Sequence, residues 1–265
     1  DLRGFLEERH TRLRPVFSTD FTRTAWTISH AGSVVEIALD RGKIEALGVA
    51  EGGDRITETL CELELELIEG KSTDVLFDLA IALATDLHLH PEIASKAERG
   101  YALAEGALSQ PVKAFASAVD RKMTPVDAFR SIALTSLAQL QRNESGAIAR
   151  VNPEFVHQSR VAIRRLRSAL KLFSPVLSTS FVDVYSPRWQ ALAERLGSAR
   201  DWDVFLSETL VPLEEAFPGD ADLALLRARS ESTKAKAQAA ASIALSQRDY
   251  SQLVLALTAA LFRIE

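Results

Sequence analysis

The apolar pattern of this chain changes near residue 105, from the alternation typical of strands to the spacing typical of helices. Before that point, short runs rich in β-branched and aromatic residues lie between turn formers, over residues 13–17, 22–29 and 34–40. After it, apolar residues recur three and four positions apart, as from Phe129 to Leu140. This change predicts an α+β chain in which an antiparallel sheet module, residues 1–105, precedes an all-α helical bundle, residues 106–265.

The strictest alternation lies in Cys61–Glu69, where Glu62, Glu64 and Glu66 alternate with leucines. A strand with this pattern has one acidic face, on which neighbouring carboxylates are about 7 Å apart. That face either lies in solvent on a half-buried sheet or lines a polar barrel interior, where cations hold the carboxylates together. In the second case Glu62, Glu64 and Glu66 are candidate ligands for Mg²⁺ or Mn²⁺, which prefer oxygen donors.

Several basic residues lie on or near predicted strands of the same module: Arg14, Arg23, Lys96 and Arg99. If they face the same interior as the glutamates, the module combines metal-binding carboxylates with phosphate-binding cations. Phosphoryl transfer needs that combination, because it depends on positioning the phosphates and neutralising their charge.

Turn formers and prolines divide the rest of the chain. Hairpin connections are predicted at Ala31-Gly32-Ser33 and at Asp40-Arg41-Gly42. A helix is predicted over 74–86 and another short element around 95–103. The predicted bundle helices cover 111–121, 125–142, 153–175, 187–196, 201–213, 220–247 and 250–265, with Gly197 as a weak point and Pro218-Gly219-Asp220 as a break.

A basic helix is the clearest functional feature. Residues 155–182 contain five Lys or Arg, one His and no acidic residue. On a helix with about 100° per residue, five of the six fall within an arc of roughly 80°: His157, Arg160, Arg164, Arg167 and Lys171. A solvated surface face normally includes acids that pair with the bases one turn away. Their absence, and the bidentate binding of phosphate by guanidinium groups, favours an anion-binding face.

Charge and composition limit the function classes. The net charge is −9 over residues 1–110 and +4 over residues 111–265, which indicates two modules with different roles. The single cysteine excludes a disulfide framework and favours a reducing compartment, so we expect a cytoplasmic protein. No apolar run approaches the ~18 residues of a membrane span.

The first module resembles CYTH domains, the triphosphate tunnel metalloenzymes, and within them the bacterial inorganic triphosphatases. The motifs occur in the same order: Arg23-Thr-Ala-Trp26, Val35-Glu36-Ile-Ala-Leu-Asp40, Glu62-Leu-Glu64-Leu-Glu66 and Ser95-Lys96-Ala-Glu-Arg99-Gly. The resemblance implies a partial antiparallel β-barrel that binds a triphosphate and a divalent metal. By position, Glu62 and Glu64 match metal-binding carboxylates, and Arg23 and Lys96 match phosphate-contacting cations. These four are the predicted catalytic residues.

One family motif is not found. The N-terminal Glu-x-Glu-x-Lys strand, which supplies further metal and phosphate contacts in the family, does not occur in the printed sequence. We therefore expect residues 1–105 to represent the C-terminal part of such a domain.

The second module is similar to CHAD domains, whose helical bundles have two related halves and bind inorganic polyphosphate on a basic surface. Phe155-Val-His157-Gln-Ser-Arg160 with Arg164-Arg165-Leu-Arg167 matches the first family signature, and Arg200-Asp201-Trp-Asp203 matches the next. Only one such basic helix is present, so residues 106–265 are expected to be the N-terminal part of that domain. The implied polyphosphate-binding residues are His157, Arg160, Arg164, Arg165, Arg167, Lys171, Arg195 and Arg200.

Three functions follow as hypotheses. The leading one is metal-dependent hydrolysis of tripolyphosphate in the barrel, combined with binding of inorganic polyphosphate by the helical bundle. The alternative is a non-catalytic polyphosphate-binding or targeting module with an inactive barrel. Nucleic-acid binding is disfavoured, because few aromatic residues accompany the basic stripe and base stacking needs them.

Overall fold

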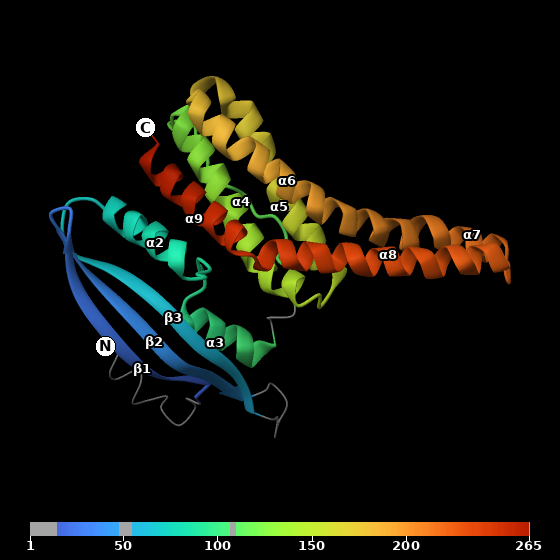
Figure 1. Ribbon diagram of the computed structural model, residues 1–265, viewed down its shortest axis with the longest axis horizontal. Helices are drawn as coiled ribbons and strands as arrows, with labels where there is room; N and C mark the ends of the chain where they lie inside the picture. The colour runs from blue at the N-terminus through green and yellow to red at the C-terminus, as the bar shows by residue number, and fades with distance from the viewer. Residues whose placement is uncertain (1–14, 48–54, 107–109, 265) are drawn as a thin grey trace. The chain divides into compact units, whose positions relative to one another are not determined.

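The computed structural model describes residues 15–47, 55–106 and 110–264 (Figure 1). The chain divides into two compact units, one of Asp1–Lys71 with Ala94–Gln110 and the other of Ser72–Ile93 with Pro111–Glu265. The first contains the strands and one helix, and the second is helical, which confirms the predicted α+β class. The predicted strand residue Leu13 and the candidate cation Arg14 lie outside the described residues.

The described strands of the first unit form one antiparallel sheet in the order β1-β2-β3. Their bounds are Phe17–His30 for β1, Ser33–Leu47 for β2 and Arg55–Glu69 for β3. The sheet is open, so the described residues of the predicted partial barrel form a curved sheet rather than a closed tunnel (Figure 1).

One of the two predicted hairpin turns is confirmed. Ala31 and Gly32 connect β1 to β2, and both have positive φ, 48° and 75°, as a two-residue hairpin turn of the primed type requires. The turn predicted at Asp40-Arg41-Gly42 is wrong, because β2 continues through it to Leu47. Gly42 instead permits close strand approach, since a Cβ there would lie 2.0 Å from the carbonyl oxygen of Asp20.

The short element predicted near residues 95–103 is the helix α3, Lys96–Glu105, so Lys96 and Arg99 do not lie on a strand. The Ser95 side chain accepts a hydrogen bond from the Glu98 backbone N–H, and the Glu98 carboxylate accepts one from the Ser95 N–H. This capping box starts α3, and Gly106, with φ of 65°, ends it. The Ser-x-x-Glu spacing was a readable signal for a helix start.

The helices of the second unit pack around one apolar core. Trp189, Phe129 and Phe155 are its largest fully buried side chains. The bounds are α2 Asp74–Asp86, α4 Pro125–Ile148, α5 Pro153–Phe173, α6 Thr179–Val204, α7 Val211–Ala216, α8 Ala221–Ser246 and α9 Arg248–Arg263, with short 3-10 and π segments η3 Ser174–Val176 and η4 Phe205–Leu210. No helix among the described residues is long and apolar enough to cross a membrane.

The helix α2 is bound to α9 at both of its ends. Arg263 forms ion pairs with Asp74 and Asp78 in the first turns of α2. At the other end, Arg248 donates hydrogen bonds to the carbonyl oxygens of Thr85 and Asp86. These contacts make α2 a part of the helical unit, although in sequence it directly follows the sheet.

Two helix predictions need correction. Residues 111–120 are not helical, because side chains from other helices satisfy their backbone: Asn143 bonds both the N–H and the carbonyl of Val112. The helix predicted from Pro187 begins earlier, at Thr179, and the weak point predicted at Gly197 does not interrupt it. Ser178 caps α6, which then runs without interruption past Pro187 and Gly197 to Val204.

Candidate functional site

Strand register places three charged residues of the sheet in one row. Arg23 on β1 lies opposite Asp40 on β2, and Asp40 lies opposite Glu62 on β3. Directly opposed side chains of an antiparallel sheet share a face, and residues two apart on one strand share it too, so Glu64 lies on the same side. The row therefore gathers one cation and three carboxylates on one face of the sheet.

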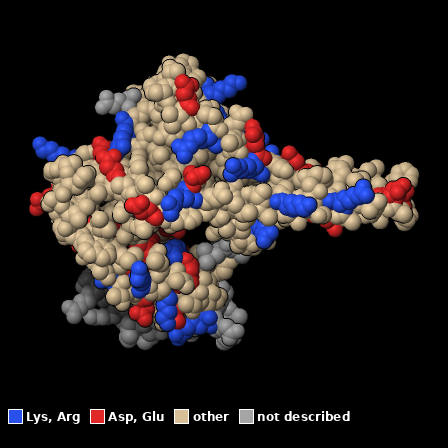
Figure 2. All heavy atoms as spheres, viewed as in Figure 1, with Lys and Arg blue, Asp and Glu red and all other residues tan. Residues whose placement is uncertain are grey.

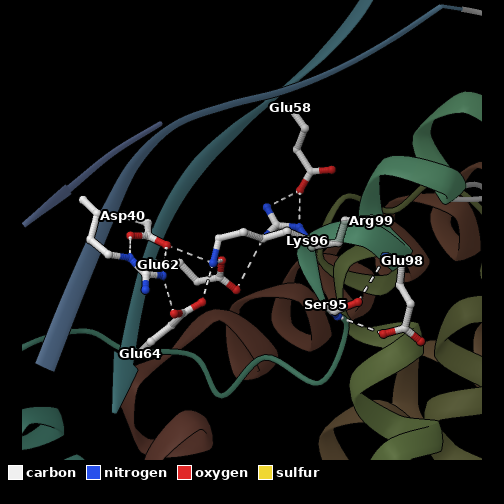
Figure 3. A network of polar contacts seen from close by, with 9 residues as sticks. Asp40, Glu58, Glu62, Glu64, Ser95, Lys96, Glu98 and Arg99 are labelled. Atoms are coloured by element: carbon white, nitrogen blue, oxygen red, sulfur yellow. Dashed lines mark hydrogen bonds and ion pairs between the residues drawn. The ribbon is translucent and has the colours of Figure 1, made fainter. Parts of the chain in front are cut away.

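Lys96 reaches this row from the first turn of α3 (Figure 3). Its Nζ lies 3.0 Å from Asp40 Oδ2 and 2.8 Å from Glu62 Oε2, and it also contacts Glu64. Arg23 completes the network, with Nε 2.7 Å from Asp40 Oδ1 and Nη2 2.5 Å from Glu64 Oε2. All four predicted catalytic residues are thus brought together around Asp40.

The pairing shifts the acid–base equilibria toward the charged forms. The pKa of Asp40 falls to about 2, mainly because the Arg23 guanidinium donates to it and despite the burial of the carboxyl group. The hydrogen bond from Lys96 lowers the pKa of Glu64 as well. Burial opposes charge on Lys96, but its bonds to Glu62, Glu64 and Asp40 outweigh this and raise its pKa.

Acid is expected to destabilise the sheet unit through Asp40. Because the folded-state pKa of Asp40 lies below its ordinary value of 3.8, its contribution to stability is complete above pH ~4 and is lost as the pH falls toward 2. Chemical denaturation at pH steps across this range is the measurement. Asp40→Asn should show a weaker pH dependence of the free energy of unfolding there. Equal slopes in both proteins would contradict the assignment.

Beside this network, Arg99 forms an ion pair with Glu58, a carboxylate that the sequence analysis did not identify. Arg99 Nη2 lies 2.5 Å from Glu58 Oε1, and its Nη1 lies 3.7 Å from Glu62 Oε1. Asp40 was predicted as the last residue of a strand and the first of a turn, and it was not predicted as a site residue. The alternation Glu36, Ala38, Asp40 would have placed it on the strand face with Glu62. The third predicted metal ligand, Glu66, is exposed on β3.

The carboxylates fit a hard divalent cation in donor type. Asp40, Glu62 and Glu64 converge on one cationic atom, Lys96 Nζ, and Glu58 Oε2 is a buried carboxylate oxygen without a hydrogen-bond partner. Oxygen ligands of this kind suit Mg²⁺ and Mn²⁺. No group of three acidic, His or Cys residues in the described ranges forms a ready metal cage, since the ammonium of Lys96 holds the point of convergence.

The helical unit contains a groove of about 1150 Å³ between α5, α6, η4 and α8. Its α5 wall consists of His157, Arg160, Val161, Arg164 and Arg167. These side chains lie on one face of α5 because they are three or four positions apart, as the sequence predicted. The opposite face of α5 is buried in the core, as expected for Ala162, Leu166, Ala169 and Leu170.

The arginines of this groove differ in how far acids neutralise them. Arg160 donates to Asp201 and to the carbonyl of Gly197, and Arg200 lies 3.9 Å from Glu208. Arg164 and Arg167 have no acidic partner in the part of the chain that the structure describes. Figure 2 shows further Lys and Arg side chains along the projecting α6–α8 helices. Arg164 and Arg167 are therefore the groove arginines whose charge the described acids neutralise least.

Three predicted polyphosphate-binding residues are not among the residues that line the groove. Lys171 and Arg195 are exposed elsewhere on α5 and α6. Arg165 faces the bundle, where Nη1 donates to the buried Gln139 Oε1 and Nη2 to the carbonyl oxygen of Phe115. It holds the non-helical segment 111–120 against α4 and α5.

Arg165→Ala is expected to lower the free energy of unfolding by about 1–3 kcal/mol, because Gln139 loses a donor inside the bundle. Arg164→Ala, one position away and exposed, should change it by less than about 0.5 kcal/mol. Urea denaturation of the two variants gives the comparison. Equal losses would contradict the structural role of Arg165.

Comparison with known proteins assigns a domain family to each part of the chain. The sequence matches the CYTH domain family over residues 2–101 and the CHAD domain family over residues 131–264. An inorganic triphosphatase of Haemophilus influenzae is 40% identical over 91 residues, which are 34% of this chain and 24% of that protein. The crystal structure of the CHAD domain from the plant Ricinus communis matches with a TM-score of 0.50 and 36% identity. That match covers 58% of this chain and 51% of the plant chain.

The chain spans only part of both relatives, about a quarter of the triphosphatase and half of the plant chain. The family match to CHAD covers half of the residues, and the CYTH match covers the sheet, α2 and most of α3. Both resemblances inferred from the motifs are thereby confirmed. The chain belongs to the CHAD family, and it carries a CYTH domain ahead of its CHAD domain.

Proposed function

We propose that this protein acts on condensed phosphates, binding inorganic polyphosphate in the α5 groove and contributing the sheet unit to a metal-dependent triphosphatase site. The observation that carries the binding function is the pair Arg164 and Arg167, which line the groove without acidic partners among the described residues. The inorganic triphosphatase relative supports the choice of condensed phosphate over other anions.

The groove suits a repeating anion. Arg160, Arg164 and Arg167 follow one another at about one helical turn, roughly 5 Å along the axis of α5. Each guanidinium binds phosphate oxygens through two parallel N–H groups. A linear chain of phosphates lying along α5 would meet one guanidinium at each turn. His157 extends the same wall by a further turn.

In the sheet unit, Glu62 and Glu64 with Asp40 are the residues that would hold a divalent cation, and Arg23 and Lys96 would bind the phosphates. A bound divalent cation would supply the charge neutralisation that phosphoryl transfer needs. Without it, two cations face three carboxylates in the network, so one net negative charge opposes a triphosphate. We therefore expect the sheet unit to bind tripolyphosphate poorly when divalent cations are removed, whereas the α5 groove needs no metal.

The mutual pairing also favours the alternative, a non-catalytic polyphosphate-binding module. Arg23 and Lys96, the two predicted phosphate-contacting cations that the structure describes, are already paired with carboxylates. In this alternative the network only stabilises the sheet, and the groove alone meets phosphate. Both functions share the groove and differ in the chemistry of the sheet unit.

An assay of phosphate release from tripolyphosphate by the full-length protein distinguishes the triphosphatase from the non-catalytic module. The release is measured with Mg²⁺ or Mn²⁺ and again with excess EDTA. Binding of a fluorescently labelled long-chain polyphosphate is followed in parallel. Metal-dependent release together with binding supports the triphosphatase. Binding without release supports the alternative, and absence of binding would refute both.

A further inference from the structure

The α5 groove has a second wall whose chemistry differs from the arginine row. Trp202 at the end of α6 and Phe205 at the start of η4 line it, each half-buried, with ring centroids 5.6 Å apart and planes nearly perpendicular. Leu226 of α8, which is 40% exposed, lies along the same groove. An inorganic phosphate chain carries no apolar surface that could use this wall.

Helix geometry fixes where the aromatic wall lies relative to the arginines. The helices α5 and α6 form an antiparallel hairpin, since Phe173 and Phe181 both contact Phe129 at one end. Nearer the other end, Arg160 reaches Gly197 and Asp201. From that level, Phe205 lies about 6 Å further along α6, and Arg164 lies about 6 Å away in the opposite direction on α5.

The groove is therefore graded along its length. Towards one end lie the rings of Trp202, about 1.5 Å beyond Asp201 along α6, and of Phe205. The middle has Arg160 paired with Asp201. Towards the other end lie Arg164 and Arg167, which have no acidic partner among the described residues, although Glu194 also lines the groove. A complementary ligand has a flat apolar group at one end and anionic groups at the other. Between them, Asp201, which is 75% exposed, can accept hydrogen bonds from hydroxyl groups.

We propose that this groove is a binding site for nucleoside polyphosphates, with the base against Trp202 and the phosphates along Arg160, Arg164 and Arg167. The proposal rests on the proposed function for the phosphate half of the site, and adds the base-binding half. Aromatic side chains bind any base through its π face, so the site need not select one base. The sequence did not show this, because the aromatic residues come from a different helix than the basic stripe.

The test compares ATP with inorganic tripolyphosphate by isothermal titration of the full-length protein in EDTA, using wild type, Trp202→Ala and Trp202→Phe. Trp202→Ala should weaken ATP binding by about 10-fold, in line with the loss of one base-stacking contact. It should change tripolyphosphate binding by less than about 2-fold. Trp202→Phe keeps an aromatic ring and should retain most of the ATP affinity. Thermal denaturation checks that both variants are folded.

Salt gives a second reading of the same site. The arginine contribution to ATP binding should fall as salt rises, whereas the Trp202 contribution should persist, because stacking is not screened. No ATP binding, an ATP affinity unchanged in Trp202→Ala, or an equal loss for both ligands would overturn the proposal. Arg164→Ala with Arg167→Ala isolates the phosphate half: retained polyphosphate binding there refutes the proposed function but leaves the Trp202 result to decide the base site.

Discussion

Replacing Arg164 and Arg167 together by alanine is expected to weaken the binding of long-chain inorganic polyphosphate by about 100-fold. Each lost guanidinium removes charge-assisted hydrogen bonds, worth roughly 1.5–3 kcal/mol per contact. Two losses of this size correspond to at least ~100-fold in the dissociation constant. The measurement is fluorescence anisotropy of a labelled polyphosphate at fixed ionic strength.

The matched control removes the same charge from positions outside the groove. Arg188→Ala with Lys236→Ala takes two exposed cations from α6 and α8. Long-range attraction to a polyanion falls equally in both double variants, so only the direct contacts differ. We therefore expect the affinity of the control for polyphosphate to fall by less than about 5-fold, from the loss of long-range attraction alone. Equal losses in the two double variants would mean that net charge, and not the groove, binds polyphosphate.

Glu64→Gln is expected to lower kcat/KM for tripolyphosphate by about 100-fold or more in the full-length protein. The substitution preserves shape but removes a carboxylate charge that would hold the metal, and losses of this size are typical for groups that position charge in a transition state. Glu64 is 42% exposed, so the fold should tolerate the change. Phosphate release at saturating Mg²⁺ is the measurement.

Glu69→Gln is the control, since Glu69 lies exposed at the end of the same strand. The metal concentration needed for half-maximal activity should rise in Glu64→Gln and stay unchanged in Glu69→Gln. Wild-type rates in Glu64→Gln would remove that residue from the metal site. The same experiment on Glu62→Gln tests the neighbouring carboxylate, which is 18% exposed and contacts both Lys96 and Arg99.

Local patterns predicted several elements well. The helix α2 has the predicted bounds of 74 and 86, and α5 runs from Pro153 to within two residues of Pro175. Asp220 caps α8, accepting hydrogen bonds from Asp222 and Leu223. Proline, glycine and capping residues act on the backbone within one turn, so their effects are readable without the rest of the fold.

Predictions were wrong where distant residues decide the backbone. Residues 111–120 have no helix because Asn143 and Arg165 satisfy their carbonyl groups from α4 and α5. Gly42 was predicted to lie in a turn, but it lies within β2, where the absence of a Cβ lets the backbone of Asp20 on the neighbouring strand come close. Such contacts join residues about 20 to 50 positions apart, which no local pattern encodes.

The sequence by itself determined the faces: an acidic face on β3 and a basic face on α5, because strand and helix periods are properties of the local backbone. Only the tertiary structure decided which charges meet. It pairs Lys96 with three carboxylates, leaves Lys171 of the basic row outside the groove and brings Trp202 to the groove. The reason is that charge pairing depends on distances of a few ångströms between elements, and packing alone sets those distances.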